Sequence, residues 1–179
     1  MCGFTAAMLD RGADMIYLFN HFYNTVDITY PDEYKAAMSH CGKMETVIDK
    51  PRRNMVTRQD IFAPGQTGSS LLPAEIEPQA SRQFPIYTGP KPKTGKVIVR
   101  VGLDNNPDIE KVKFTASVNS IMCKQIQDND TPEEFLSSRV LQFDAPLDAM
   151  QRGYNTIEVS HNGNGGIQKI VWVEFYIIP

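Results

Sequence analysis

Hydrophobic and polar residues are arranged differently in the first 50 residues and in the rest of the chain. Residues 3–9 are apolar and rich in small residues, and this segment is expected to form the last turns of a helix. It is followed by Arg11 and Gly12, where a glycine suits the left-handed conformation that closes many helices. Residues 13–20 form a continuous apolar run without alternation, which predicts a strand buried on both faces. Residues 31–49 begin with a proline and carry apolar residues at helical spacing, so one or two short helices are expected there.

Beyond residue 50 the pattern is typical of short strands separated by turns, because proline and glycine are too closely spaced for helices of ordinary length. Pro85 lacks an N–H donor and therefore places its strand at a sheet edge. The glycine-rich residues 162–166 are expected to form a hairpin turn. The expected strands are residues 54–61, 80–88, 96–103, 112–118, 120–126, 139–143, 153–160 and 167–178. Their number and spacing predict a mainly β protein, an antiparallel β-sandwich or jelly roll that follows a short α/β segment.

Composition and charge narrow the possible functions. Hydrophobic residues make up 41% and charged residues 22%, as in an ordinary globular protein. The net charge is −3 and the basic residues are scattered, which argues against nucleic acid as a partner. No apolar run is long enough to predict a membrane helix, so no membrane partner is expected. The small basic clusters at residues 50–53 and 91–96 are interleaved with proline and glycine, and we interpret them as solvated linkers.

The cysteine and histidine residues do not predict a metal site or a cofactor. Cys2, Cys41 and Cys123 lie far apart without a CxxC spacing, and this favours free thiols over zinc ligands or a disulfide framework. One disulfide pair with a spare cysteine remains an open alternative. His40 and His161 have no partner at metal-ligand spacing.

Two stretches resemble parts of known proteins. Residues 12–22, with the string GADMIYLFNHF, resemble the eighth strand of a (β/α)8 barrel in bacterial glycoside-hydrolase-like proteins. The pattern from Pro146 to Val159, which includes GYNTIEV, and the closing strand at residues 170–178 resemble a galactose-binding-type jelly roll of polysaccharide-degrading enzymes. This resemblance implies that residues 1–50 are the end of a barrel (helix, strand, helix) and that residues 51–179 are an accessory sandwich domain.

The resemblance also implies where substrate would bind. Asn20 and His21 fall at the C-terminal end of the barrel-like strand, where barrel enzymes build their sites, and they are candidate substrate-binding residues. His21 is also flanked by phenylalanines, which favours a packed histidine. Alternation places Trp172 and Tyr176 on the outer face of the closing strand, where they could stack on a sugar or pack against the barrel, and we favour packing. The residues expected on the core face are Val171, Val173, Phe175 and Ile177.

The leading hypothesis is therefore a non-catalytic C-terminal accessory region of a glycoside hydrolase, which supports the barrel or positions polysaccharide. No catalytic residue is expected, because the acids of barrel enzymes generally lie on earlier strands that this chain lacks. The alternatives are a stand-alone carbohydrate-binding module and a structural, self-assembling domain. The expected partners are carbohydrate and either the rest of a barrel or a second copy of the chain. The resemblance implies a periplasmic or secreted location.

Overall fold

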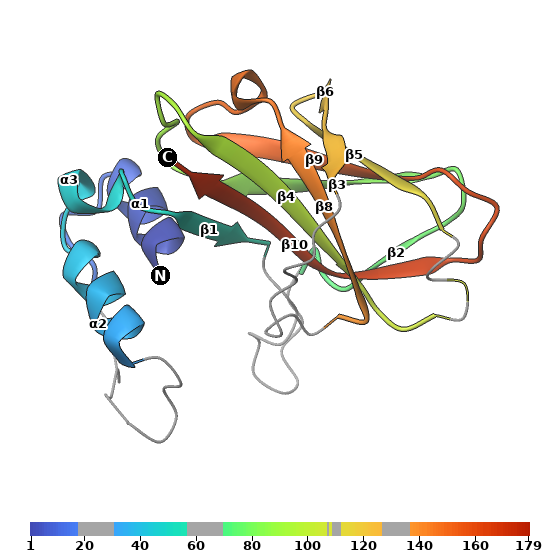
Figure 1. Ribbon diagram of the computed structural model, residues 1–179, viewed down its shortest axis with the longest axis horizontal. Coiled ribbons are helices and arrows are strands. Elements are labelled where there is room, and N and C mark those ends of the chain that lie inside the picture. Colours follow the sequence, from blue (N-terminus) through green and yellow to red (C-terminus); the bar gives the residue numbers. More distant parts are fainter. Residues whose placement is uncertain (18–30, 57–69, 107, 109–111, 127–136) are drawn as a thin grey trace.

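The computed structural model describes residues 1–17, 31–56, 70–106, 108, 112–126 and 137–179. Two antiparallel sheets face each other, and three helices lie at one end of the sandwich (Figure 1). The mainly β sandwich predicted from the sequence is confirmed. The elements are α1 (Cys2–Asp10), α2 (Pro31–His40), α3 (Met44–Val47), β1 (Arg52–Met55), β2 (Ala74–Ile76), β3 (Ser81–Tyr87), β4 (Lys96–Leu103), β5 (Phe114–Val118), β6 (Ile121–Met122), β7 (Lys124–Ile126), β8 (Arg139–Ala145), the 3-10 helix η2 (Leu147–Ala149), β9 (Tyr154–His161) and β10 (Gln168–Ile178).

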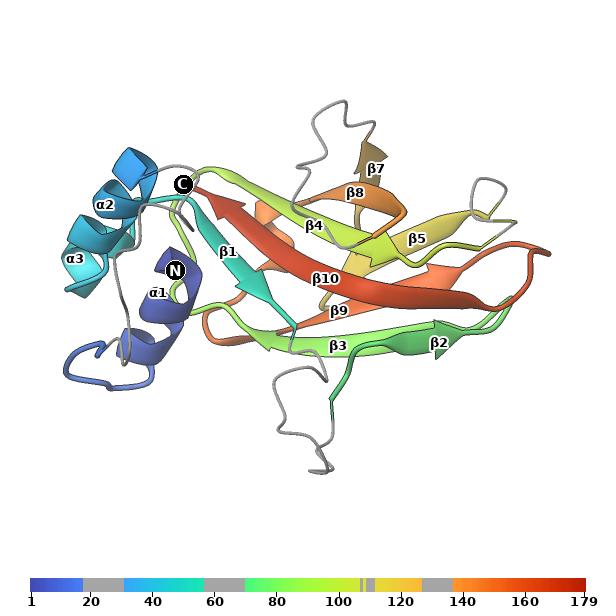
Figure 2. The same ribbon diagram turned by 90° about the horizontal axis from the view of Figure 1, so that it is seen from below.

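The long strand β10 organises the larger sheet. The strand order is β1-β10-β4-β8-β7, and β2 pairs with β10 on the same side as β1. The smaller sheet has the order β3-β9-β5-β6, so β3, which contains Pro85, lies at an edge as predicted. Figure 2 shows β1 and β3 at the neighbouring edges of the two sheets, with α1 beside them.

The hydrophobic core lies between the sheets and follows the predicted alternation. In β9, Asn155, Ile157 and Val159 point inward, while Thr156 and Glu158 remain partly exposed. Apolar residues at alternate positions of β3, β4 and β5 are also buried in the core. Burial of a large apolar side chain stabilises a fold by about 1.5–3 kcal/mol. The inward residues of β4 and β5 are Val97, Val99, Val101, Leu103, Phe114, Ala116 and Val118.

The inward face of β10 differs from the prediction at one residue. Ile170 belongs to the core, and Val171, although buried, does not. The cause is an irregularity in the pairing with β4, where Ile170 lies opposite Leu103 and the next paired residue is Trp172. A β-bulge of this kind adds one residue to a strand and reverses the alternation on either side.

Four strands or connections also differ from the predicted ones. The expected strand at residues 120–126 is two short strands, β6 in the smaller sheet and β7 in the larger one. Residues 162–166 do not form a hairpin turn, because β9 and β10 lie in different sheets. The three-residue strand β2 was not predicted, since it is too short to show a period. The predicted strand at residues 54–61 begins earlier, at Arg52, and residues 57–61 lie outside the described part of the chain.

The first helix ends as the sequence predicts. Gly12 has φ of +97°, and the amides of Gly12 and Ala13 donate to the carbonyls of Leu9 and Met8. These two hydrogen bonds form a Schellman motif, in which the residue after the cap adopts the left-handed conformation that glycine reaches without strain. The helices predicted within residues 31–49 are present as α2 and α3.

The predicted buried strand at residues 13–20 is wrong for its described part. Residues 13–17 form no strand, and Met15 and Tyr17 are 74% and 81% exposed. A buried parallel strand requires a hydrogen-bonded neighbour on each side, and the described residues supply neither. No described helix has both the length and the apolar character needed to cross a membrane.

Candidate functional site

A charged cluster lies on the outer face of the larger sheet, and Glu174 on β10 is at its centre. The side chain of Glu174 points away from the core and is nevertheless fully buried. Arg53 on β1 donates Nε to both carboxylate oxygens at 3.1 Å and Nη2 to Oε2 at 2.9 Å. Arg100, which lies opposite Glu174 on β4, donates Nη1 to Oε1 at 3.1 Å. A buried carboxylate needs such pairing, because an unpaired buried charge is strongly destabilising.

The two predicted aromatic residues border this cluster. Trp172 and Tyr176 are both half-buried, and the Trp172 Nε1 donates to Glu174 Oε2 at 3.3 Å. The guanidinium carbon of Arg100 lies 4.7 Å from the centre of the Tyr176 ring, at cation–π distance. Gly102 on β4 lies opposite Trp172, and a Cβ atom there would lie 2.8 Å from the Trp172 Cβ. The absence of a side chain at Gly102 therefore makes room for the indole.

The row of polar residues continues onto β8. Arg100 Nε donates to the Gln142 Oε1 at 3.3 Å, and Gln142 is 2% exposed. Its Nε2 has no hydrogen-bond partner among the described residues. The outer face thus carries a carboxylate, two guanidinium groups and an amide, and two aromatic rings border the carboxylate and one guanidinium group.

The basic residues at the start of β1 are structural and not solvated linkers, which corrects the prediction for residues 50–53. Arg52 is fully buried and donates Nη2 to the Pro90 carbonyl at 2.9 Å. Burial lowers the pKa of Arg52, and the nearby carboxylates of Asp10 and Asp49 oppose that shift. Arg53 faces the opposite side of the strand and binds Glu174, because successive residues of a strand point to opposite faces.

A second polar cluster fixes α1 to the sandwich. Asp10, at the end of α1, accepts a hydrogen bond of 2.7 Å from the Tyr87 hydroxyl and one of 2.9 Å from Arg152 Nε. The next residue, Arg11, lies with its guanidinium carbon 4.2 Å from the centre of the Tyr87 ring. Arg11 Nη2 also donates to the Tyr154 hydroxyl at 2.7 Å. The C-terminal end of α1 is therefore held by the end of β3 and the beginning of β9.

The N-terminal half of α1 approaches the sandwich at backbone distance. A Cβ atom added to Gly3 would lie 2.1 Å from the Arg53 carbonyl oxygen. Gly89, with φ of +73°, meets the helix in the same way, because a Cβ atom there would lie 3.0 Å from the Ala6 carbonyl oxygen. The small buried residues of α1 are Gly3, Thr5, Ala6 and Ala7.

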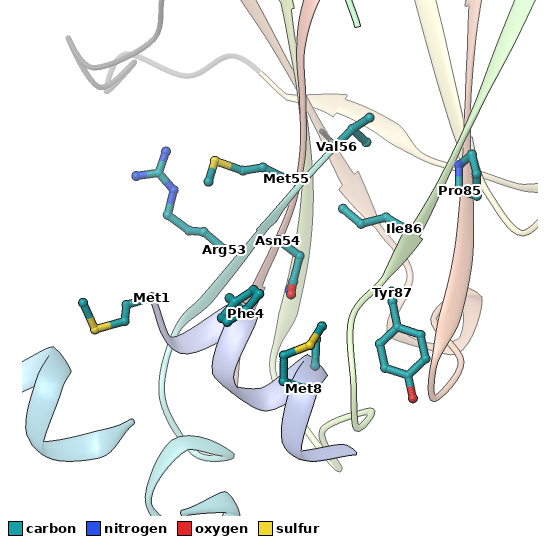
Figure 3. A pocket seen from close by; sticks show the side chains of 11 residues that line it. Met1, Phe4, Met8, Arg53, Asn54, Met55, Val56, Pro85, Ile86 and Tyr87 are labelled. Atoms are coloured by element: carbon teal, nitrogen blue, oxygen red, sulfur yellow. The ribbon is translucent and has the colours of Figure 1, made fainter. Parts of the chain in front are cut away.

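Helix α1 also borders a groove of about 380 Å³ that lies between α1, β1 and β3. Figure 3 shows Phe4 and Met8 of α1 beside β1, which carries Met55, and β3, which carries Tyr87. Phe4 is 58% exposed, Met55 is 52% exposed and Met1 is 42% exposed. Exposed large apolar side chains gathered around one groove are typical of a surface that contacts another molecule.

Of the predicted site residues, the structure describes Trp172 and Tyr176. Trp172 and Tyr176 lie on the outer face of β10, as alternation predicted. Asn20 and His21 lie outside the described residues, so their proposed contact with substrate stays a prediction. Arg100 lies on the outer face of β4, and the pairing of β4 with β10 brings it to Glu174; the sequence pattern does not contain this pairing. Within the described residues, no group of three or more His, Cys, Asp or Glu side chains has metal-binding geometry.

In comparisons with known proteins, the chain is similar only to solved structures, and this similarity is low. No family model and no curated protein matches the chain. Among solved structures, the chain is similar to BuGH86, a glycoside hydrolase of family 86 crystallised with neoagarooctaose, with a TM-score of 0.48 and 19% sequence identity. The similarity covers 70% of this chain and 18% of the BuGH86 chain. A variant of BuGH86 in complex with the same oligosaccharide gives the same values. The chain thus spans less than a fifth of the length of BuGH86.

Proposed function

We propose that this chain is a non-catalytic accessory region of a larger sugar-processing protein, in which the sandwich supports the segment around α1. The observation that carries the proposal is that α1 is fixed to the sandwich and still exposes a large apolar side chain. Gly3 and Asp10 hold the helix against the sandwich, and Phe4 is exposed at the edge of the groove between α1, β1 and β3. A helix that is held firmly and exposes large apolar groups beside a groove is suited to join two bodies. The body we propose is the rest of a (β/α)8 barrel, as the resemblance of residues 12–22 implies.

The hydrogen-bond partners of two carboxylates, Glu174 and Asp10, support a non-catalytic role. Glycoside hydrolysis generally needs two facing carboxyl groups, one of which gives a proton to the leaving group. Glu174 is enclosed by two guanidinium groups, and Asp10 binds Tyr87 and Arg152. Both carboxylates thus have structural partners and are not arranged as an acid and base pair.

The test is to probe the apolar groove with a fluorescent hydrophobic dye such as anilinonaphthalene sulfonate. The intact chain is expected to bind the dye, and Phe4→Glu is expected to remove most of the signal, because the charge lies at the groove. Ile167→Glu is the matched control, since Ile167 is 49% exposed and does not line the groove. Equal losses in both variants would contradict the use of this face. Hydrolysis of a polysaccharide that one acid-to-amide substitution abolishes would contradict the non-catalytic role.

A second candidate function is carbohydrate binding on the outer face of the larger sheet. The observation that favours it is the pair of half-buried rings, Trp172 and Tyr176, on either side of the Glu174 cluster. Sugar rings stack on aromatic faces. Charged groups beside the rings can bind the sugar hydroxyls, because a carboxylate accepts hydrogen bonds from them and a guanidinium group donates hydrogen bonds to them. Arg100 already covers part of the Tyr176 ring, which makes Trp172 the better stacking surface.

Trp172 is the single tryptophan of the chain, so its fluorescence reports on this face alone. A panel of oligosaccharides that includes neoagarooctaose is titrated into the protein. Binding at this face would change the emission with saturation, and Tyr176→Ala would weaken the response while Tyr17→Ala would leave it unchanged. A flat titration across the panel would contradict carbohydrate binding here and would leave the supporting role as the single proposal.

A further inference from the structure

Two cysteine residues from separate helical segments lie in contact. The Sγ atoms of Cys2, at the start of α1, and Cys41, directly after α2, are 3.8 Å apart, although 39 positions separate the residues. Cys41 is 7% exposed and Cys2 is half-buried. The sulfur atoms of a disulfide are about 2.05 Å apart. The two Sγ atoms would therefore have to move closer by under ~2 Å to reach bonding distance.

The third cysteine lies elsewhere in the fold. Cys123 lies between β6 and β7, and its Sγ atom is 3.9 Å from the Ile121 carbonyl oxygen. Burial raises the pKa of the Cys123 thiol to about 11. The sequence left open whether the chain has one disulfide pair and a spare cysteine, and the geometry identifies which residues would take each part.

We propose that Cys2 and Cys41 form a disulfide bond when the protein meets a small-molecule disulfide, and that this bond ties the end of α2 to α1. The Cys2 thiol, which is the more exposed, loses its proton to solvent and its sulfur attacks one sulfur of the reagent. This step forms a mixed disulfide and releases one reagent thiolate. The Cys41 thiol then loses its proton to solvent, its sulfur attacks the Cys2 sulfur, and the second reagent thiolate leaves. The two released thiolates take up the two protons lost by Cys2 and Cys41. The protein dithiol is oxidised, and the reagent disulfide is reduced to two thiols.

The surroundings of Cys2 determine how fast the exchange proceeds. Burial raises the pKa of Cys2, and the neighbouring Cys41 raises it further. The thiolate is the nucleophile, so the rate of oxidation is expected to rise with pH through the neutral and mildly alkaline range.

The experiment treats the full chain with oxidised glutathione, alkylates the remaining thiols and digests the protein with trypsin without reduction. Cleavage after lysine and arginine gives the peptides 1–11, 36–43 and 114–124, each with one cysteine. The expected product is peptide 1–11 joined to peptide 36–43, with peptide 114–124 alkylated. The number of free thiols in the denatured protein is expected to fall from three to one.

Variants complete the test. Cys123→Ser is the matched control and should give the same linked peptides as the unaltered chain. Cys2→Ser and Cys41→Ser should lose the linkage and keep both remaining thiols free of any bond to each other. Three free thiols after oxidation, a stable glutathione adduct on Cys2 beside a free Cys41, or a linkage that involves Cys123 would each overturn the proposal. These outcomes are measured on the unaltered chain or on Cys123→Ser, so they do not depend on the folding of the other variants.

Discussion

The hydroxyl of Tyr87, at the end of β3, donates a hydrogen bond of 2.7 Å to the carboxylate of Asp10, at the end of α1. The bond spans 77 positions of sequence and joins the first helix to the sandwich. It also raises the pKa of Tyr87, because only the neutral phenol can donate the hydrogen to the carboxylate, and burial and the charge of Asp10 act in the same direction.

The raised pKa predicts how the attachment of α1 depends on pH. A tyrosine in an unfolded chain ionises near pH ~10. Because the folded-state pKa of Tyr87 is higher, the contribution of the bond to stability is complete below that pH and is lost as the pH rises through the folded-state value. The absorbance of phenolate is measured against pH for the unaltered chain and for Tyr87→Phe, and the difference between the two curves reports on Tyr87. The midpoint of this difference should lie above pH ~10. A difference curve with a midpoint at or below the ordinary value would contradict the prediction.

The close contact between α1 and β1 predicts a large effect of one methyl group. Gly3→Ala places a Cβ atom 2.1 Å from the Arg53 carbonyl oxygen, so the helix must move away from the strand. We expect the free energy of unfolding to fall by about 1–3 kcal/mol. Gly42→Ala is the control, because a Cβ atom at Gly42 meets nothing within 4 Å. Urea denaturation measures both variants, and equal stability of the two would show that α1 is not held at this distance.

The buried cluster on the larger sheet predicts a further loss of stability. Glu174→Gln keeps the shape of the side chain and removes the charge between Arg53 and Arg100. Breaking a buried ion pair by removing one partner costs about 3–5 kcal/mol. Glu75→Gln, at an exposed position of β2, should change the free energy of unfolding by less than about 0.5 kcal/mol. Denaturant unfolding compares the two variants, and a Glu174→Gln protein as stable as the control would contradict the structural role of the carboxylate.

Asn155, within the jelly-roll-like pattern, connects three segments of the chain. Its Nδ2 donates to Thr88 Oγ1 at 2.9 Å, and its Oδ1 accepts from the Asn119 Nδ2 at 2.8 Å and the Gln151 amide at 2.9 Å. Asn155→Ala removes these three hydrogen bonds, and the Gln151 amide loses its bond to the side chain, while Thr88 and Asn119 keep bonds to the carbonyls of Gly153 and Ala149. We expect a loss of about 1–3 kcal/mol. Thermal unfolding of Asn162→Ala, whose side chain makes an exposed hydrogen bond, provides the comparison. The prediction fails if both substitutions lower the melting temperature equally.

Features that depend on neighbouring residues in the sequence could be predicted well. The inward residues of β4 and β9 follow from alternation, and the end of α1 follows from the conformational freedom of Gly12. The exchange of Ile170 for Val171 in the core could not be predicted, because the bulge arises only when β10 pairs with β4.

The candidate site could be predicted only in part, because most of its contacts arise from the pairing of strands and not from the pattern of residues along the chain. Trp172 and Tyr176 could be placed on the outer face of β10 by alternation alone. Arg53 was interpreted as a linker residue because prolines and basic residues surround it, and only the pairing of β1 with β10 brings it to Glu174. The apolar run at residues 13–17 has the pattern of a buried strand, but a pattern does not supply the neighbouring strands that bury it.

The central position of β10 has a consequence for the order in which the protein is made. This strand follows β1, β2 and β4 in the chain, and all three pair with it. During synthesis, β1 and β2 have no strand to pair with until β10 is made. Until then β4 also lacks its neighbour on that side of the larger sheet. The larger sheet therefore closes after translation of residues 168–178, and a nascent chain that stops before them retains unpaired edges and an open core.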